Sequence, residues 1–577
     1  MGHSNNQRRG YWGGDRVTRR GFVQGASALA TFAAGATLVG CGDDDDAQPS
    51  SAAPTAAAPT AANPASPAAR IPVKGGTLTL AFSLEPPDMD PTKTLSAGLH
   101  TVVTPIYSKL VRTVLPLEAK NAQDFTITAD LAETWEQVDL QTYTFKLHKG
   151  VTWHDIAPLN GRALVAADVK FALTAYAAGG PHASAFDLID SISTPDDQTV
   201  AIKLKEPFAL FLDAVSNATR QIFAPEAAQR SGGGLSATPV IGTGPFVFKN
   251  FSRGTSFEAT RNPKFFRAGY PHLDGYKMLL ISDPATRVAS FRAGAVHAIS
   301  PSWAESQAIL GTHPKTVFEE GVAVHSTFNL GMNTKKPPFN DPRVRRAISM
   351  GFDRKATVDS IFGGHAITGW GIPWGFVQKA PWTAEQLGPW NKYNVTEAKK
   401  LLDAAGFSKG FKTTLFFFQY TADMASQIQL FQAEMKANLN IDIELQPLDY
   451  ATYFNRVTSR DWDGTAWAFQ IGSSASVDDF LYKNMRTGGG GNYYYIADPE
   501  IDKRVERIRA EPDAAARTLL IKEVVAIDQD MMYRVFQPMY NGFQVADPKY
   551  QGWSPNRQFR GSLGYGTDSF EQSWLTA

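Results

Sequence analysis

The sequence has almost no cysteine, no excess of either charge and no hydrophobic run long enough to suggest a membrane span. Of 577 residues only Cys41 is a cysteine, so neither an intrachain disulfide nor a cysteine-based metal site can form. Basic and acidic residues both number 56, so the formal net charge is zero, without the basic excess that marks nucleic-acid binding. We therefore expect a soluble globular body that needs no metal or cofactor and does not bind nucleic acid.

Common catalytic motifs are also missing. The chain has no G-x-S-x-G elbow and no H-E-x-x-H pair. The glycine quartet 488–491 lacks the Lys-Ser/Thr that completes a phosphate-binding loop. Paired carboxylates stay possible, although nothing singles out one pair. An exported hydrolase is therefore an alternative without a specific motif behind it, and we expect no catalytic residues.

The N-terminus is typical of an export signal. Arg19-Arg20 precedes a small-residue apolar run that ends in Leu38-Val39-Gly40-Cys41. The first part resembles a twin-arginine signal and the second a bacterial lipobox, which predicts a signal peptide over 1–40 and a lipid on Cys41. An ordinary buried cysteine in a helix is the alternative. Residues 41–70 are rich in Asp, Ala, Pro, Ser and Thr, which predicts a disordered tether of about 30 Å root-mean-square span.

The remaining chain alternates strand and helix signals. The run 75–82 alternates like a strand, and Gly242-Thr-Gly-Pro245 predicts a turn into a strand beginning at Phe246. Apolar residues recur at helical spacing after Val165. Asp283-Pro284 and Asp341-Pro342 each read as a helix cap followed by a first-turn proline, and Asn394-Val-Thr-Glu397 reads as a capping box at the start of a helix. This mixture predicts an α/β protein, and its length predicts more than one lobe.

Several motifs in this order resemble one family, the extracellular solute-binding family 5 of peptide/nickel-type ABC importers. The segments that carry the resemblance are Asp88-Met-Asp90-Pro91, Trp153-His-Asp155 with Gly161 to Phe171, Ile241 to Phe246, Asn262 to Phe266, and Pro338 to Ile348 with Asp353-Arg354. The resemblance extends over about residues 74–577.

The resemblance implies a periplasmic-binding-protein type II-like fold, with two lobes joined by a hinge and an extra inserted domain. Lobe I would combine 71–109, 238–322 and 539–577. Domain II would be the insertion 110–237, and lobe III would be 323–538. The ligand would lie between lobes I and III and favour their closure.

The ligand-binding residues are less clearly indicated. In peptide-binding relatives one strand supplies an aromatic wall and an aspartate for the peptide ammonium. Here the aromatic position falls on Phe469 or, in a shifted register, on Trp467, and the aspartate position falls on Gly472 or Gln470. Trp467 and Phe469 share a strand face, so either could line the cleft or pack in the core. Both registers lack the carboxylate that a desolvated ammonium needs.

Other aromatic and polar residues are further candidates. Trp370 and Trp374 lie in a loop that faces ligand in relatives and could stack on rings or sugars. Tyr494, within the triplet 493–495, could do the same or could belong to a packed strand. His100 lies in an expected loop over 95–101 that borders the cleft in relatives, or is an ordinary surface histidine.

The resemblance implies a substrate-binding lipoprotein that delivers a solute to the membrane subunits of an ABC importer. It would be anchored by its lipid at the cell membrane, would face the periplasm or cell exterior, and would act as a monomer. A peptide or peptide-like compound is the favoured ligand. An oligosaccharide or another ring-bearing solute is the alternative, and a chaperone-like lipoprotein is a further class.

Overall fold

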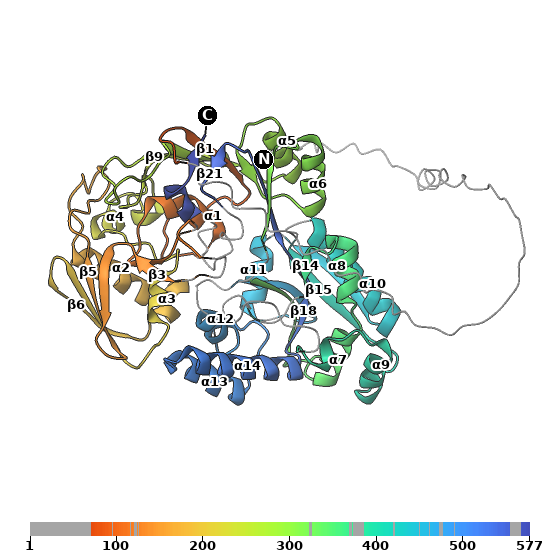
Figure 1. The fold of residues 1–577 in the computed structure, drawn as a ribbon. Helices are drawn as coiled ribbons and strands as arrows, with labels where there is room; N and C mark the ends of the chain where they lie inside the picture. Colours follow the sequence, from red (N-terminus) through yellow and green to blue (C-terminus); the bar gives the residue numbers. More distant parts are fainter. Residues whose placement is uncertain are drawn as a thin grey trace, which may run out of the picture. The chain divides into compact units, whose positions relative to one another are not determined.

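The first strand of the folded body, β1 (Thr77–Phe82), forms where the alternating pattern predicts it. The computed structural model describes residues 71–577 except 95, 116, 121–123, 125, 322–325, 369–371, 373–385, 419–421, 449, 461, 472–476, 490, 554–566 and 577. Residues Ile71–Ala577 make up one compact unit (Figure 1). Cys41 and the expected signal peptide and tether lie outside the described residues.

Strand β1 pairs with a strand from far along the chain. Its sheet has the order β1-β10-β9-β8, with β1 and β10 parallel and the other pairs antiparallel. The partners are β8 (Phe246–Ser252), β9 (Ser256–Arg261) and β10 (Gly275–Leu280). The chain therefore leaves this sheet after β1 and returns to it at β8, about 160 residues later.

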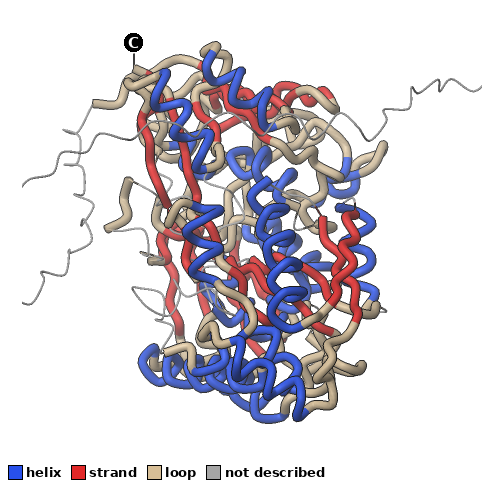
Figure 2. Tube along the Cα trace, turned by 90° about the vertical axis from the view of Figure 1, so that its right-hand side faces the viewer, coloured by secondary structure: helices blue, strands red, loops and turns tan. Residues whose placement is uncertain are grey.

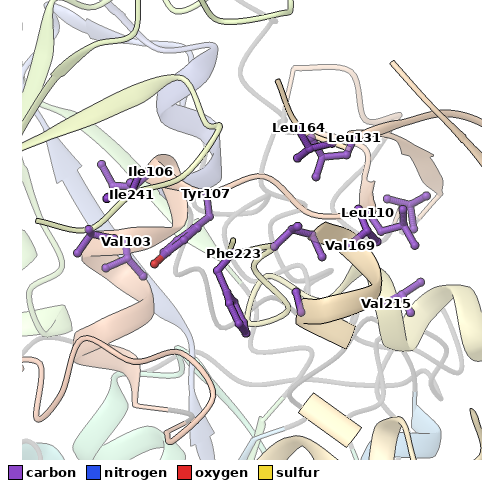
Figure 3. Close-up of a cluster of buried hydrophobic side chains, with 14 of the residues drawn as sticks. Val103, Ile106, Tyr107, Leu110, Leu131, Leu164, Val169, Val215, Phe223 and Ile241 are labelled. Atoms are coloured by element: carbon purple, nitrogen blue, oxygen red, sulfur yellow. The ribbon is translucent and has the colours of Figure 1, made fainter. Parts of the chain in front are cut away.

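The glycines before β8 allow two backbones to touch. A Cβ on Gly242 would lie 2.1 Å from the carbonyl oxygen of Ile106, and one on Gly244 would lie 2.7 Å from it. Gly244 N donates a hydrogen bond to that same oxygen (2.9 Å). Ile241 and Ile106 lie together in the hydrophobic cluster of Figure 3. The predicted turn into a strand is confirmed, and its glycines are needed for close approach because a side chain there would collide with the backbone.

Residues between β1 and β8 build a second antiparallel sheet, of order β4-β5-β7-β6. Its strands are β4 (Ala132–Gln137), β5 (Thr142–Leu147), β6 (Ile189–Asp196) and β7 (Thr199–Leu204). Helix α2 (Ala166–Ala177) contacts β6 and β7 and buries Val169, Leu173 and Tyr176, as the helical spacing predicts. Smaller elements complete this region: β2 (Val111–Thr113), β3 (Ile127–Ala129), α3 (Phe211–Ser216) and α4 (Pro225–Gln229).

A third sheet joins the middle of the chain to its C-terminal part. It has the order β11-β20-β12, with β11 (Ala298–Ile299), β12 (Val317–Gly321) and β20 (Gly542–Ala546). Helices α5 (Pro284–Arg292) and α6 (Trp303–Thr312) lie beside it. The Asp283 carboxylate caps α5 by accepting from Thr286 N, as predicted.

The largest sheet is formed by residues 326–537, in the order β16-β15-β17-β13-β18. Its strands are β13 (Ser326–Met332), β15 (Lys412–Phe418), β16 (Asp442–Leu448), β17 (Thr465–Ile471) and β18 (Arg534–Gln537). The helices of this region are α7 (Pro342–Met350), α8 (Arg354–Phe362), α9 (Val395–Ala404), α10 (Ala422–Leu439) and α11 (Tyr450–Ser459). Asp341 caps α7 and Asn394 caps α9, both as predicted. Figure 2 shows the helices lying against the strands.

Three further helices pack around their own apolar cluster: α12 (Val477–Asn484), α13 (Pro499–Ala510) and α14 (Ala514–Met531). The hydrophobic clusters divide along the sequence. Two are built from residues within 78–318 and 543–575, and three from residues within 328–540. Because the clusters do not mix these two sets, the described chain has two separately packed bodies.

A buried ionic network ties the C-terminal segment to the first body. Arg267 donates to both carboxylate oxygens of Glu571 (2.7 and 2.8 Å) and to Asp130 (2.7 Å). Glu571 belongs to the 3-10 helix η6 (Thr567–Glu571), which lies in the sequence between two short paired strands, β21 (Tyr550–Gln551) and β22 (Trp574–Leu575). Both acids are almost fully buried, so the arginine offsets a large desolvation cost.

Candidate functional site

Two stretches of chain cross between the two bodies side by side. Strand β12 is followed by β13, and β18 is followed by β19 (Met539–Tyr540) and β20. β12 pairs with β20 in one sheet, whereas β13 pairs with β18 in the other. Paired strands on each side, joined by short links, are the arrangement expected of a hinge.

A polar and aromatic cluster braces this crossing. His365 Nδ1 lies 2.9 Å from Glu320 Oε2, and the imidazole stacks on the Trp303 indole with 3.6 Å between ring centroids. Asn541 donates its side-chain amide to Glu320 and its backbone N–H to His365 O (3.0 Å). A short ladder between β14 (Ala366–Ile367) and β19 continues the contact. These residues are distant in sequence, so no local pattern could have identified them.

Trp467 lies in the core of the second body. It is 1% exposed, and its ring meets Phe431 edge-on with centroids 5.8 Å apart. Tyr453 donates its hydroxyl to the backbone oxygen of Trp467 (3.0 Å). The sequence left open whether Trp467 lines the cleft or packs in the core. In this structure it packs in the core.

Phe469 and Gln470 lie beside the crossing. On β17 their backbones pair with Phe328 and Thr327 of β13, and β13 begins at Ser326, directly after the link from β12. The side chains of both residues lie outside the described residues. Their backbone positions therefore lie at the end of the sheet nearest to the hinge.

Tyr494 is fully buried against a glycine. A Cβ on Gly331 would lie 2.0 Å from Cε1 of the Tyr494 ring, so only glycine leaves room for that ring on β13. Burial raises the pKa of the phenol well above its ordinary value. The Tyr494 hydroxyl has no hydrogen-bond partner among the described residues. The surrounding cluster is apolar and includes Phe416 and Trp462.

His100 is buried, and its expected position in a surface loop is wrong. It belongs to helix α1 (Ala97–Val103) and is 0% exposed. Its Nε2 lies 3.1 Å from Thr94 O, and its Nδ1 lies 3.0 Å from Gln221 Nε2. Burial lowers the pKa of the imidazole to about 4, so the ring is neutral near pH 7. The sequence around His100 could not show this burial, because it depends on the distant segment 217–221, which packs over the imidazole.

Trp370, Trp374 and Cys41 lie outside the described residues. The structure thus brings Phe469 and Gln470 close to the crossing and places Trp467 and Tyr494 in apolar cores. A void of about 10 Å³ in the core of the second body, lined by residues such as Leu330, has room for about one water molecule and none for a solute.

The described residues contain neither a candidate metal site nor a candidate membrane span. No group of three or more His, Cys, Asp or Glu side chains is placed to hold a metal ion. None of the described helices is both long and apolar enough to cross a bilayer.

Comparison with known proteins gives consistent matches. The family model "Bacterial extracellular solute-binding proteins, family 5 Middle" matches residues 126–492. The chain is 27% identical to di/tripeptide-binding protein 2 of Pseudomonas aeruginosa, over 81% of this chain and 90% of that protein. Such relatives are substrate-binding proteins of ABC importers, not enzymes.

Solved structures match the fold over most of the chain. The periplasmic binding protein AgaA of A. tumefaciens R10, in complex with agropinic acid, has a TM-score of 0.73 at 25% identity and covers 87% of this chain and 99% of that protein. Helicobacter pylori DppA, in complex with the peptide STSA, has a TM-score of 0.73 at 23% identity and covers 88% and 99%. These matches confirm the expected α/β, periplasmic-binding-protein type II-like fold. The chain belongs to the bacterial extracellular solute-binding proteins, family 5.

Proposed function

We propose that this protein is an extracytoplasmic lipoprotein that captures a peptide or peptide-like solute between its lobes and delivers it to the membrane subunits of an ABC importer. The observation that carries this proposal is the pair of crossings between two bodies with separate cores, in a chain of this family. A solute that contacts both bodies only when they are closed would shift the population toward closure.

The proposed domains follow the sheets. Lobe I combines 71–109, 238–322 and 539–577, which contain the β1-β10-β9-β8 and β11-β20-β12 sheets. Domain II is 110–237, with the β4-β5-β7-β6 sheet, and lobe III is 323–538, with the five-stranded sheet. Membership of these sheets supports the division, since residues of one sheet move together.

Phe469 and Gln470 are our first candidates for ligand contact within lobe III. Their support is the position of their backbones at the hinge end of β17. Trp370 and Trp374 are proposed as further contacts on the strength of the family resemblance. Trp467, Tyr494 and His100 are buried in this structure, so we do not propose them as ligand contacts.

A peptide is favoured because a relative that matches over most of its length is a di/tripeptide-binding protein. A second ligand class, oligosaccharides or other ring-bearing solutes, has its own support. The position that carries an aspartate in peptide-binding relatives is Gln470 or Gly472 here, so the usual partner of a peptide ammonium is missing. AgaA, a protein of similar structure, is bound to agropinic acid and not to a peptide.

We further propose that Cys41 carries a lipid and that 41–70 tethers a monomeric body to the cell membrane, facing the periplasm or cell exterior. Support comes from the twin-arginine and lipobox patterns before it. Cys41→Ser is expected to move the protein from the membrane fraction to the soluble fraction. A variant that remains in the membrane fraction would contradict lipid attachment at this residue.

The proposed function is tested by releasing the bound solute. The full chain is purified under native conditions, denatured and analysed by mass spectrometry for small molecules. A series of peptides, or one sugar-like compound, would identify the ligand class, and titration of the refolded protein with that compound would measure its affinity. If no released or added compound binds while the protein turns over a substrate, the proposal is refuted.

A further inference from the structure

Domain II touches lobe III through a contact separate from the hinge. The segment before helix α3 lies against helices α12 and α13, and Figure 1 draws α3 beside α12. Ala209 N donates a hydrogen bond to the backbone oxygen of Arg509 on α13 (2.8 Å). Some 300 residues separate these partners, and they belong to the two separately packed bodies.

The side chain of Arg509 fills this contact. Its guanidinium carbon lies 4.6 Å from the centroid of the Phe208 ring and 3.8 Å from that of Tyr482 on α12. Arg509 is 5% exposed and Phe208 is 2% exposed. A guanidinium held between two aromatic rings and shielded from water gains more from cation–π attraction than an exposed one does. One of the rings belongs to domain II and the other to lobe III.

Charges around the sandwich match across the contact. Asp187 of domain II lies 3.9 Å from Arg509. Asp213 on α3 lies within the electrostatic reach of Arg517 on α14. Thus one ion pair, between Asp187 and Arg509, spans the contact, and Asp213 is attracted electrostatically to a second arginine of lobe III.

The contact would break if the bodies swung apart. Phe208 follows strand β7 and is part of the hydrophobic cluster of the first body. Tyr482 of α12 and the apolar residues of α13 pack with the helical cluster of the second body. Each aromatic ring is thus fixed to its own body, so opening at the hinge would separate Phe208 from Arg509 and expose both.

We propose that Phe208, Arg509 and Tyr482 form a latch that holds domain II against lobe III and thereby stabilises the closed arrangement. This inference rests on the proposed function, since it assumes that the bodies open and close. Arg509 acts as a positioning residue, because its effect on ligand binding passes through closure. When only the closed arrangement binds tightly, the apparent Kd rises in proportion as the closed fraction falls.

The test measures closure without requiring a known ligand. Spin labels are placed on Leu140→Cys in domain II and Leu519→Cys in lobe III, positions that are 51% and 61% exposed. The full chain carries Cys41→Ser so that only these two sites react. Pulsed dipolar spectroscopy then gives the distribution of distances between the labels, both as purified and after unfolding and refolding has removed bound solute.

Arg509→Ala is expected to lower the ratio of short to long distances about tenfold, equivalent to about 1.4 kcal/mol. Arg509→Lys keeps a cation between the rings and should retain part of the short-distance population. The matched control is Arg504→Ala on the same helix, because the ion pairs of Arg504 with Glu500 and Glu523 both lie within lobe III. Hydrogen exchange at Ala209 should rise in Arg509→Ala and stay unchanged in the control.

Distance distributions for Arg509→Ala that coincide with those of the unsubstituted protein in both preparations would overturn the latch. A lower Tm with unchanged distances and unchanged exchange at Ala209 would also overturn it, because it would assign Arg509 to packing alone. Failure to find a solute would count against the proposed function, yet the distance ratios between variants would still test the latch.

Discussion

Trp467→Ala distinguishes a core role for this tryptophan from direct contact with ligand. The side chain is 1% exposed and packs against Phe431 in the largest apolar cluster of lobe III. Removing a buried tryptophan costs about 3–5 kcal/mol, because transfer free energy is lost and a cavity remains. For a body of this size each 1 kcal/mol lowers Tm by roughly 2–4 °C, so a fall of about 10 °C is expected.

The assay pairs thermal unfolding with ligand titration well below the new Tm. The ligand affinity of the folded protein should change less than threefold, because the buried Trp467 side chain is not exposed to a ligand. Trp467→Phe is the matched control. The Trp467 indole N–H has no acceptor among the described residues, so phenylalanine loses no hydrogen bond and should cost less than half as much. A tenfold or greater loss of affinity with an unchanged Tm would refute this reasoning.

Three further predictions concern buried groups. Asp213→Asn should gain about 2 kcal/mol of stability relative to the unsubstituted protein as pH rises from 4 to 8. Burial raises the pKa of the Asp213 carboxyl to about 6 despite Arg517. The native aspartate therefore contributes stability at low pH and loses that contribution as pH rises through 6. Gly331→Ala should cost about 1–3 kcal/mol in urea unfolding, because its methyl group would overlap the Tyr494 ring. Arg267→Met should cost about 3–5 kcal/mol at pH 8 and less at pH 5, because burial raises the pKa of the Glu571 carboxyl, which can then take up a proton when its arginine partner is missing.

Each of these predictions has a contradicting result. A stability difference for Asp213→Asn that does not vary with pH would show that this carboxyl has an ordinary pKa. Gly331→Ala should be rescued in part by Tyr494→Leu, and the lack of any coupling would contradict the close approach. An equal loss for Arg267→Met at pH 5 and pH 8 would assign its role to packing, since buried charges alone make the loss depend on pH.

Local signals in the sequence were enough to predict individual elements. The caps Asp283, Asp341 and Asn394 and the helical spacing after Val165 give the starts of four helices, because a cap acts within three residues of its own backbone. The order of motifs also predicted the family and the α/β fold. Each motif is contiguous, so it can be identified without knowledge of tertiary contacts.

The sequence could not decide which side chains face a ligand. Alternation along β17 puts Trp467 and Phe469 on one face, yet it does not say whether that face meets solvent or another layer. Burial of Trp467 follows from helix α10, whose Phe431 packs on that face. His100 was expected at the surface and is covered by a segment more than 115 residues further along the chain.

The contacts between the two bodies are determined by tertiary structure alone. Glu320 with His365 at the hinge and Phe208 with Arg509 at the opposite contact join residues 45 and about 300 positions apart. No spacing rule relates such partners, because their distance depends on how whole sheets and helices pack. The sequence by itself determined the family and the elements of this protein, and only the fold decided which residues were buried and which met across the two bodies.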